Sequence, residues 1–177
     1  MNSRAVWVAQ TGIFLALLIV AQVATRPFGN SILTGSLNNM LFILTVMVCG
    51  LSSAIILGVI SPVIALLLGM APFWPFLPVI ICGNLVLVSL WHFIALKDRD
   101  SGKARKVIAL VVAAVIKFLV LYIGIVSFVV PLVLGLEEPQ ASAVSAAFSW
   151  PQIVTASIGG VLALLLFPVL NKALPKR

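Results

Sequence analysis

One lysine, Lys117, lies in the middle of an apolar segment, KVIALVVAAVIKFLVLYIGIVSFVV, which runs from Lys106 to Val130. In a helix it would lie about 16 Å from Lys106 along the axis, close to the midplane of a hydrocarbon core about 30 Å thick. A lysine side chain does not reach water from that depth, and placing it there costs about 2.5–3.5 kcal/mol. The ammonium therefore needs partners. Either backbone carbonyls and asparagines hold it, or a ligand supplies an anion.

The other strongly polar side chains inside apolar segments are few, and most of them are amides. They are Asn38 and Asn39 in TGSLNNMLF, Asn84 in ICGNLVLV and Gln152 in SWPQIVTASIGG. Each amide could simply hydrogen-bond between helices, which is worth about 0.6–2 kcal/mol per bond in a membrane. With Lys117 they would instead form a binding site that combines one cation with neutral hydrogen-bonding groups.

The chemistry that the sequence lacks excludes several functions. The four carboxylates, Asp98, Asp100, Glu137 and Glu138, lie in predicted loops, so no intramembrane acid is present to carry a proton or bind a catalytic metal. The single His92 cannot build a metal site. The segment DSGKAR resembles the end of a phosphate loop but lacks its first glycine and its Ser or Thr. We expect no catalytic residue, no metal and no cofactor, and energy for uphill transport would have to come from a partner.

The composition indicates which solvent surrounds these residues. Of the 177 residues, 63% are hydrophobic and 8% are charged, and the mean hydropathy is +1.28, whereas soluble domains carry about 25% charged residues. Apolar runs of about 20 residues without strand-like alternation indicate membrane-spanning helices. The predicted fold class is therefore an all-α integral membrane protein.

Breaks in the apolar pattern divide the chain into six predicted helices within one transmembrane domain, 1–177. The breaks are TRPFGN, CGLSS, GMAPFWPFLP, KDRDSGKARK and GLEEPQAS, because Gly, Pro and clusters of polar residues interrupt regular structure. The helices are expected at about 5–24, 31–49, 53–69, 77–96, 106–130 and 150–170. The break between the second and third helices is the weakest of the five.

The basic residues predict the orientation of these helices. With both termini in the cytoplasm, the cytoplasmic set is Arg4, Lys97, Arg99, Lys103, Arg105, Lys106, Lys172, Lys176 and Arg177. Arg26 is then the one basic residue outside, and Glu137 and Glu138 face outward. This asymmetry follows the positive-inside rule. The net charge of +7 therefore requires no nucleic-acid partner.

Small residues form a stripe on the first and on the last predicted helix. The stripes are Ala5, Ala9, Gly12 and Ala16 on the first helix, and Gln152, Ala156, Gly159 and Ala163 on the sixth. Small side chains let helix backbones approach closely in lipid. Packing within the protein is enough to explain the sixth helix. The first stripe continues to the cytoplasmic end, where a helix of another protein could dock.

Taken together, these features resemble the substrate-binding S component of energy-coupling factor (ECF) transporters for vitamins and related micronutrients. The resemblance covers nearly the whole chain and includes AVWVA (Ala5–Ala9), TGSLNN, SPVIALLLG (Ser61–Gly69), the GN of Gly83–Asn84 and PQIVTASIGGVLALLL. It implies a six-helix bundle with both termini inside. It also implies a non-enzymatic, high-affinity binding subunit of an ATP-driven importer, in the bacterial plasma membrane.

The resemblance further implies partners and residue roles. S components associate with a membrane coupling protein, the T component, and with two cytoplasmic ATPase subunits, and the whole S component topples to deliver its cargo. Ala5 and Ala9 would dock the coupling protein. The expected pocket residues, reached from the outer side, are Lys117, Asn84, Gln152, Asn38 and Asn39. Because Lys117 lacks a deep carboxylate partner, the expected cargo is a small water-soluble vitamin or related compound with an anionic group.

A second class of protein fits the size and topology equally well. It is a non-transporting six-helix membrane scaffold of a cell-envelope complex, similar to MreD. Such a scaffold has no need of a midplane lysine facing a cavity. A small molecule retained through purification would therefore separate the two interpretations.

Overall fold

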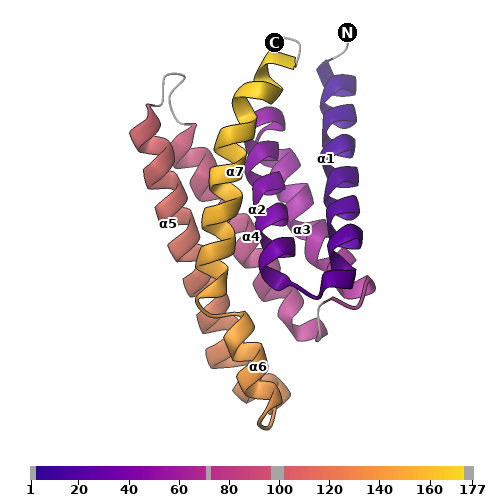
Figure 1. Ribbon diagram of the computed structural model, residues 1–177, viewed down its shortest axis with the longest axis vertical. Coiled ribbons are helices and arrows are strands. Elements are labelled where there is room, and N and C mark those ends of the chain that lie inside the picture. Colours follow the sequence, from indigo (N-terminus) through magenta and orange to yellow (C-terminus); the bar gives the residue numbers. More distant parts are fainter. Residues whose placement is uncertain (1–2, 71–72, 97–101, 174–177) are drawn as a thin grey trace.

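The computed structural model describes residues 3–70, 73–96 and 102–173, and helices make up nearly all of them (Figure 1). Within these residues, five helices are long and apolar enough to cross a membrane, and a shorter apolar helix spans Leu51–Leu67. The shorter helix has 17 residues and is therefore about 26 Å long, the lower limit for a span. The prediction of an all-α membrane protein with six apolar helices is confirmed: five are long and one is short.

The helices follow the predicted order, with additions at one end of the bundle. They are α1 (Ser3–Thr25), α2 (Ser31–Cys49), α3 (Leu51–Leu67), α4 (Leu77–Ala95), α5 (Lys103–Leu121), α6 (Gln140–Ala147) and α7 (Pro151–Ala173). Two 3-10 turns, η1 (Arg26–Phe28) and η2 (Trp74–Phe76), precede α2 and α4, and a π-helix, η3 (Tyr122–Leu134), continues α5. The fifth predicted helix, expected at 106–130, is formed by α5 and η3 together and extends further at both ends. Helix α6 lies where the sequence indicated only a loop.

Local chemistry explains how α2 is delimited. The side chain of Asn30 caps its first turn, with Oδ1 accepting hydrogen bonds from the backbone N–H groups of Ile32 at 3.0 Å and Leu33 at 3.1 Å. At the other end, Gly50 is the single residue between α2 and α3, and its φ of 92° is a conformation that side chains other than glycine rarely adopt. The chain therefore reverses sharply, and α2 and α3 pack as neighbours.

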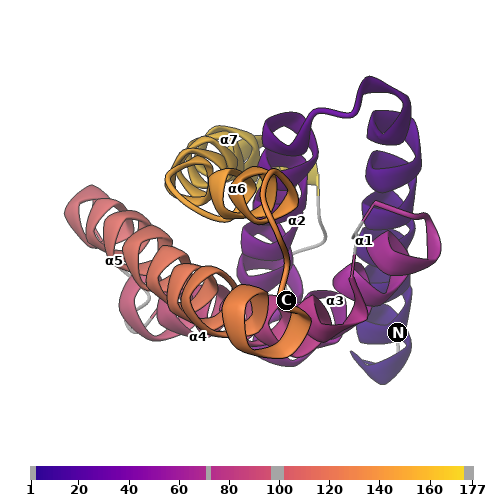
Figure 2. The ribbon, with the colours of Figure 1, turned by 90° about the horizontal axis from the view of Figure 1, so that it is seen from below.

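Helix α2 lies at the centre of the bundle and α1 at its edge. Helix α2 contacts α1, α3, α4 and α7, whereas α5 packs against α4 and α7. Figure 2 shows α1 and α5 at opposite edges. The buried share of the most apolar stretch is 56% in α2 and 22% in α1. The surface of α1 is therefore the one most available to lipid or to another membrane protein.

The two ends of the bundle differ in charge. The start of α1, the start of α5 and the end of α7 lie at the same end of the bundle (Figure 1), and this end carries Arg4, Lys103, Arg105, Lys106 and Lys172. We call it the basic end. The opposite end, formed by η1, η2 and α6, carries Arg26, Glu137 and Glu138, and we call it the cavity end. Lys97, Asp98, Arg99, Asp100, Lys176 and Arg177 lie outside the described residues.

The half of the bundle next to the basic end is closely packed. Its core includes Trp91, Leu18, Leu57 and Leu87, each with 0% exposure. Alanines at positions 109, 113 and 163 are also fully buried there and allow the helices to approach closely. A second, smaller apolar cluster around Phe76 and Ile125 lies at the cavity end.

Candidate substrate-binding site

The side chain of Lys117 is buried in the middle of the bundle, with 4% exposure. Its Nζ donates hydrogen bonds to Oδ1 of Asn39 on α2, at 2.6 Å, and to Oδ1 of Asn84 on α4, at 3.0 Å. It also lies 5.8 Å from the ring centroid of Phe42, within the range of a cation–π interaction. Asparagines of the protein therefore hold the ammonium, but neither of them supplies a negative charge.

The two asparagines are themselves fixed by other helices. Asn39 Nδ2 donates to Thr155 Oγ1 of α7 at 3.3 Å, and Asn84 Nδ2 donates to the carbonyl oxygen of Gly58 of α3 at 3.1 Å. Because each amide nitrogen is engaged elsewhere, each amide oxygen is directed at the ammonium. The hydrogen bonds of Lys117 and its partners thus join five helices, α2, α3, α4, α5 and α7.

Lys117, Asn39 and Asn84 line a cavity of about 150 Å³, which we call the inner chamber. All five predicted pocket residues line it: Lys117, Asn84, Gln152, Asn38 and Asn39. Asn38 Oδ1 is buried without a protein hydrogen bond, so it is an acceptor that a bound molecule could use. Gln152 Nε2 donates to the carbonyl oxygen of Ala147 at 3.0 Å. The structure brings the predicted residues together, and their role in binding stays a prediction.

A larger cavity of about 620 Å³, the outer chamber, lies between η1, the start of α2, the end of α3, α6 and the start of α7. The two chambers share the lining residues Gly35, Ala65, Ile80, Phe148 and Gln152, so they adjoin each other. The outer chamber has the size of a small-molecule site, about 300–1,000 Å³. The inner chamber has the volume of only about five water molecules, which is enough for a small polar group.

A family model describing the ECF transporter substrate-specific component matches residues 8–171. The chain belongs to this family. Members are substrate-binding transport subunits and not enzymes, which confirms the resemblance read from the sequence and excludes the alternative of a non-transporting scaffold. The comparison with curated proteins and the comparison with solved structures gave no significant match.

This S component also uses polar residues that the sequence analysis did not select. Gln22 on α1 is fully buried, and its Nε2 donates to Ser61 Oγ at 2.8 Å and to the Ser61 carbonyl oxygen at 3.2 Å. Ser61 lines the inner chamber, and Thr155 positions Asn39. Gln22 gave the same signal as Asn84, an amide within an apolar run. The sequence did not single out the hydroxyl side chains of Ser61 and Thr155, because such side chains are common in membrane helices.

The two stripes of small residues have different surroundings in this S component. On α7, Ala156, Gly159 and Ala163 are buried, and a Cβ atom added to Gly159 would lie 2.6 Å from the carbonyl oxygen of Ser36 on α2. That stripe packs within the bundle, as expected. On α1 the stripe residues are exposed, namely Ala5, Ala9, Gly12 and Ala16. The α1 stripe faces away from the bundle, and its docking role stays a prediction.

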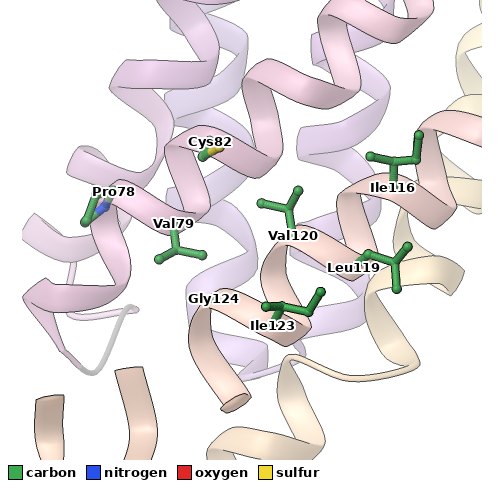
Figure 3. A pocket seen from close by; sticks show the side chains of 8 residues that line it. All are labelled: Pro78, Val79, Cys82, Ile116, Leu119, Val120, Ile123 and Gly124. Atoms are coloured by element: carbon green, nitrogen blue, oxygen red, sulfur yellow. The ribbon is translucent and has the colours of Figure 1, made fainter. Parts of the chain in front are cut away.

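A groove of about 510 Å³ between α4 and α5 has a different character (Figure 3). It is lined by Pro78, Val79, Cys82, Ile116, Leu119, Val120, Ile123 and Gly124. None of these side chains carries a charge or an amide. A water-soluble cargo needs several directed polar contacts, so this groove does not qualify as its binding site.

Proposed function

We propose that this S component binds a small water-soluble micronutrient, such as a vitamin or vitamin precursor, through an anionic group that contacts Lys117. The observation that carries the proposal is the ammonium in the inner chamber, which has two neutral amide partners and no countercharge among them. The ammonium can form a charge-assisted hydrogen bond with any acceptor, but only an anion adds Coulomb attraction, which is stronger in a buried site than in water. An anionic cargo therefore gains more at this position than a neutral one.

The sizes of the two chambers support a division of the cargo into a head and a body. The inner chamber, at about 150 Å³, accommodates an acidic group beside Lys117, and the outer chamber, at about 620 Å³, accommodates the remainder. Asn38 Oδ1 can accept a hydrogen bond from a donor next to the acidic group. Phe148 and Ile80, which line both chambers, would contact the body of the cargo between them.

The same proposal covers the partners and the sidedness. The basic end faces the cytoplasm, as the distribution of Lys and Arg predicts, and the outer chamber opens to the other side of a bacterial plasma membrane. Ala5 and Ala9 are exposed near the basic end of α1, where small side chains permit a close helix contact. We propose that a membrane coupling T component docks there and that two cytoplasmic ATPase subunits supply the energy.

Native mass spectrometry of the purified S component tests the proposal. The wild-type protein is expected to retain a small molecule whose mass and fragmentation show an acidic group, because a desolvated ion pair dissociates slowly. Lys117→Met is expected to lose this molecule. Lys172→Met, which removes a cation at the basic end, is expected to keep it. A neutral retained molecule, or equal retention by Lys117→Met, would contradict the proposal.

A further inference from the structure

The outer chamber contains a second cation, Arg26 of η1. We propose that Arg26 is the capture residue of the site, which attracts the anionic cargo into the outer chamber before Lys117 holds it. The inference rests on the proposed function, because it requires an anionic cargo. It adds a residue that acts on the rate of association, whereas Lys117 acts mainly on the rate of dissociation.

The backbone around Arg26 is constrained. The residue begins a 3-10 turn that contains Pro27, whose ring restricts the local conformation, and the N–H of Gly29 donates to the carbonyl oxygen of Arg26 at 3.1 Å. Gly29 has a φ of 57°, in the left-handed region that favours glycine. The turn therefore holds the base of the Arg26 side chain at the edge of the outer chamber.

The guanidinium of Arg26 extends from η1 toward the end of α3. A Cβ atom added to Gly69 would lie 3.9 Å from Arg26 Nη2, so the charged group lies beside this glycine, which also lines the outer chamber. The side chain of Arg26 is exposed. A solvated charge at the rim of a site changes association rates and their salt dependence more than it changes the strength of the final complex.

The charged residues that line the two chambers are both cations and favour an anion. None of the described residues that line either chamber is acidic, and Glu138 lines a separate pocket. The start of α2, with Asn30 and Ser31, also lines the outer chamber, and a helix N-terminus carries a partial positive charge. A positive charge therefore lies at each end of the path from Arg26 to Lys117. The electric field of such charges raises the association rates of oppositely charged ligands.

Stopped-flow measurements of tryptophan fluorescence test the role of Arg26, because Trp74 and Trp150 are exposed at the cavity end. The chemical probes are two pairs of acid and neutral analogue, nicotinate with nicotinamide and pantothenate with pantothenol. The S component is placed in nanodiscs of zwitterionic lipid, so that the membrane surface adds no charge. Wild type, Arg26→Gln, Arg26→Lys and the control Lys172→Gln are compared at about 10 mM and about 1 M salt, where the Debye lengths are about 30 and 3 Å.

For the acid that binds, Arg26→Gln is expected to lower the association rate constant by about threefold or more at low salt. The difference is expected to shrink toward zero at high salt, while the dissociation rate stays nearly constant. Arg26→Lys is expected to retain most of the rate and Lys172→Gln all of it. An association rate that is unchanged in Arg26→Gln at low salt, with binding still dependent on Lys117, would overturn this inference alone. If the neutral analogue binds as tightly as the acid, or if neither acid binds, both the inference and the anionic cargo are contradicted.

Discussion

The two halves of this S component are built in different ways. Next to the basic end, Trp91, Leu57 and Leu87 are fully buried in a continuous apolar core. Toward the cavity end, the helices surround two adjoining chambers, and Asn39, Asn84 and Lys117 line the inner one. Lys117 lies where the two halves meet. The closely packed half fixes the helices that carry the polar side chains of the other half, which we call the open half.

This difference has a consequence for transport. The two adjoining chambers extend from Lys117 toward the cavity end, and the core next to the basic end is close-packed. A cargo in the inner chamber would have to leave by the opening through which it arrived. This is consistent with the family mechanism implied by the resemblance, in which the whole S component reorients in the membrane.

The largest expected effect on the open half comes from Lys117→Met. Removing the ammonium should weaken binding of the acid retained through purification by about 2–5 kcal/mol, as measured by isothermal titration calorimetry. The cost of inserting a buried lysine, about 2.5–3.5 kcal/mol, disappears, whereas the amide oxygens of Asn39 and Asn84 lose their donor at about 1–3 kcal/mol each, so the melting temperature of the variant is measured alongside its affinity. Lys103→Met at the basic end is the control. Equal affinity in Lys117→Met would show that the lysine serves only to join the helices.

An intermediate effect is expected where α7 packs on α2 beside the inner chamber. In Gly159→Ala the new Cβ would lie 2.7 Å from Asn39 Cβ and from the backbone nitrogen of Met40, so the helices must separate, at a cost of about 1–3 kcal/mol. We expect a lower melting temperature and weaker cargo binding, because Asn39 moves away from Lys117. Gly12→Ala is the matched control, since nothing lies within 4 Å of the added atom. Equal melting temperatures would show that the interface is looser than the structure indicates.

The smallest effect on cargo binding is expected from Ala5→Leu combined with Ala9→Leu. Both residues are exposed near the start of α1, at the other end of this helix from Thr25, which lines the outer chamber. Calorimetry should therefore give an unchanged affinity for the cargo. Copurification with a coupling protein should be lost, because the larger side chains prevent close approach of its helix. Val20→Leu, at a position of α1 with 62% exposure, should preserve the complex. If the complex survives the double substitution, the stripe on α1 does not dock the coupling protein and is only a lipid-facing surface.

The sequence predicted much of the open half because its polar residues are scarce. An ammonium in an apolar run can find few partners in this chain, and its observed partners, Asn39 and Asn84, were among the four amides selected. The six helices followed from the length of the apolar runs and from the breakers between them. The exposed stripe on α1 followed from residue spacing alone.

Other features depended on information that the sequence does not carry. The contact of Gln22 with Ser61 depends on how α1 and α3 are rotated about their axes, and helices that are apolar all round give no amphipathic pattern from which to infer this. The π-helix η3 likewise has no distinct composition. Helix α6, in contrast, could have been inferred, because QASAVSAA is rich in alanine, the best helix former.

The hydrogen bonds of Lys117 also bear on how the protein is made. Asn39 lies on α2 and Asn84 on α4, so ribosomes synthesise both acceptors before α5 emerges with its lysine, and chain regions generally assemble in the order of synthesis. A buried lysine is costly to insert on an isolated helix, but this one can enter the bilayer beside two amide oxygens that are already there. Thr155 on α7 arrives last and accepts the hydrogen bond from Asn39 Nδ2. A circular permutation that placed α5 ahead of α2 would remove this sequence of events and should lower the yield of inserted protein.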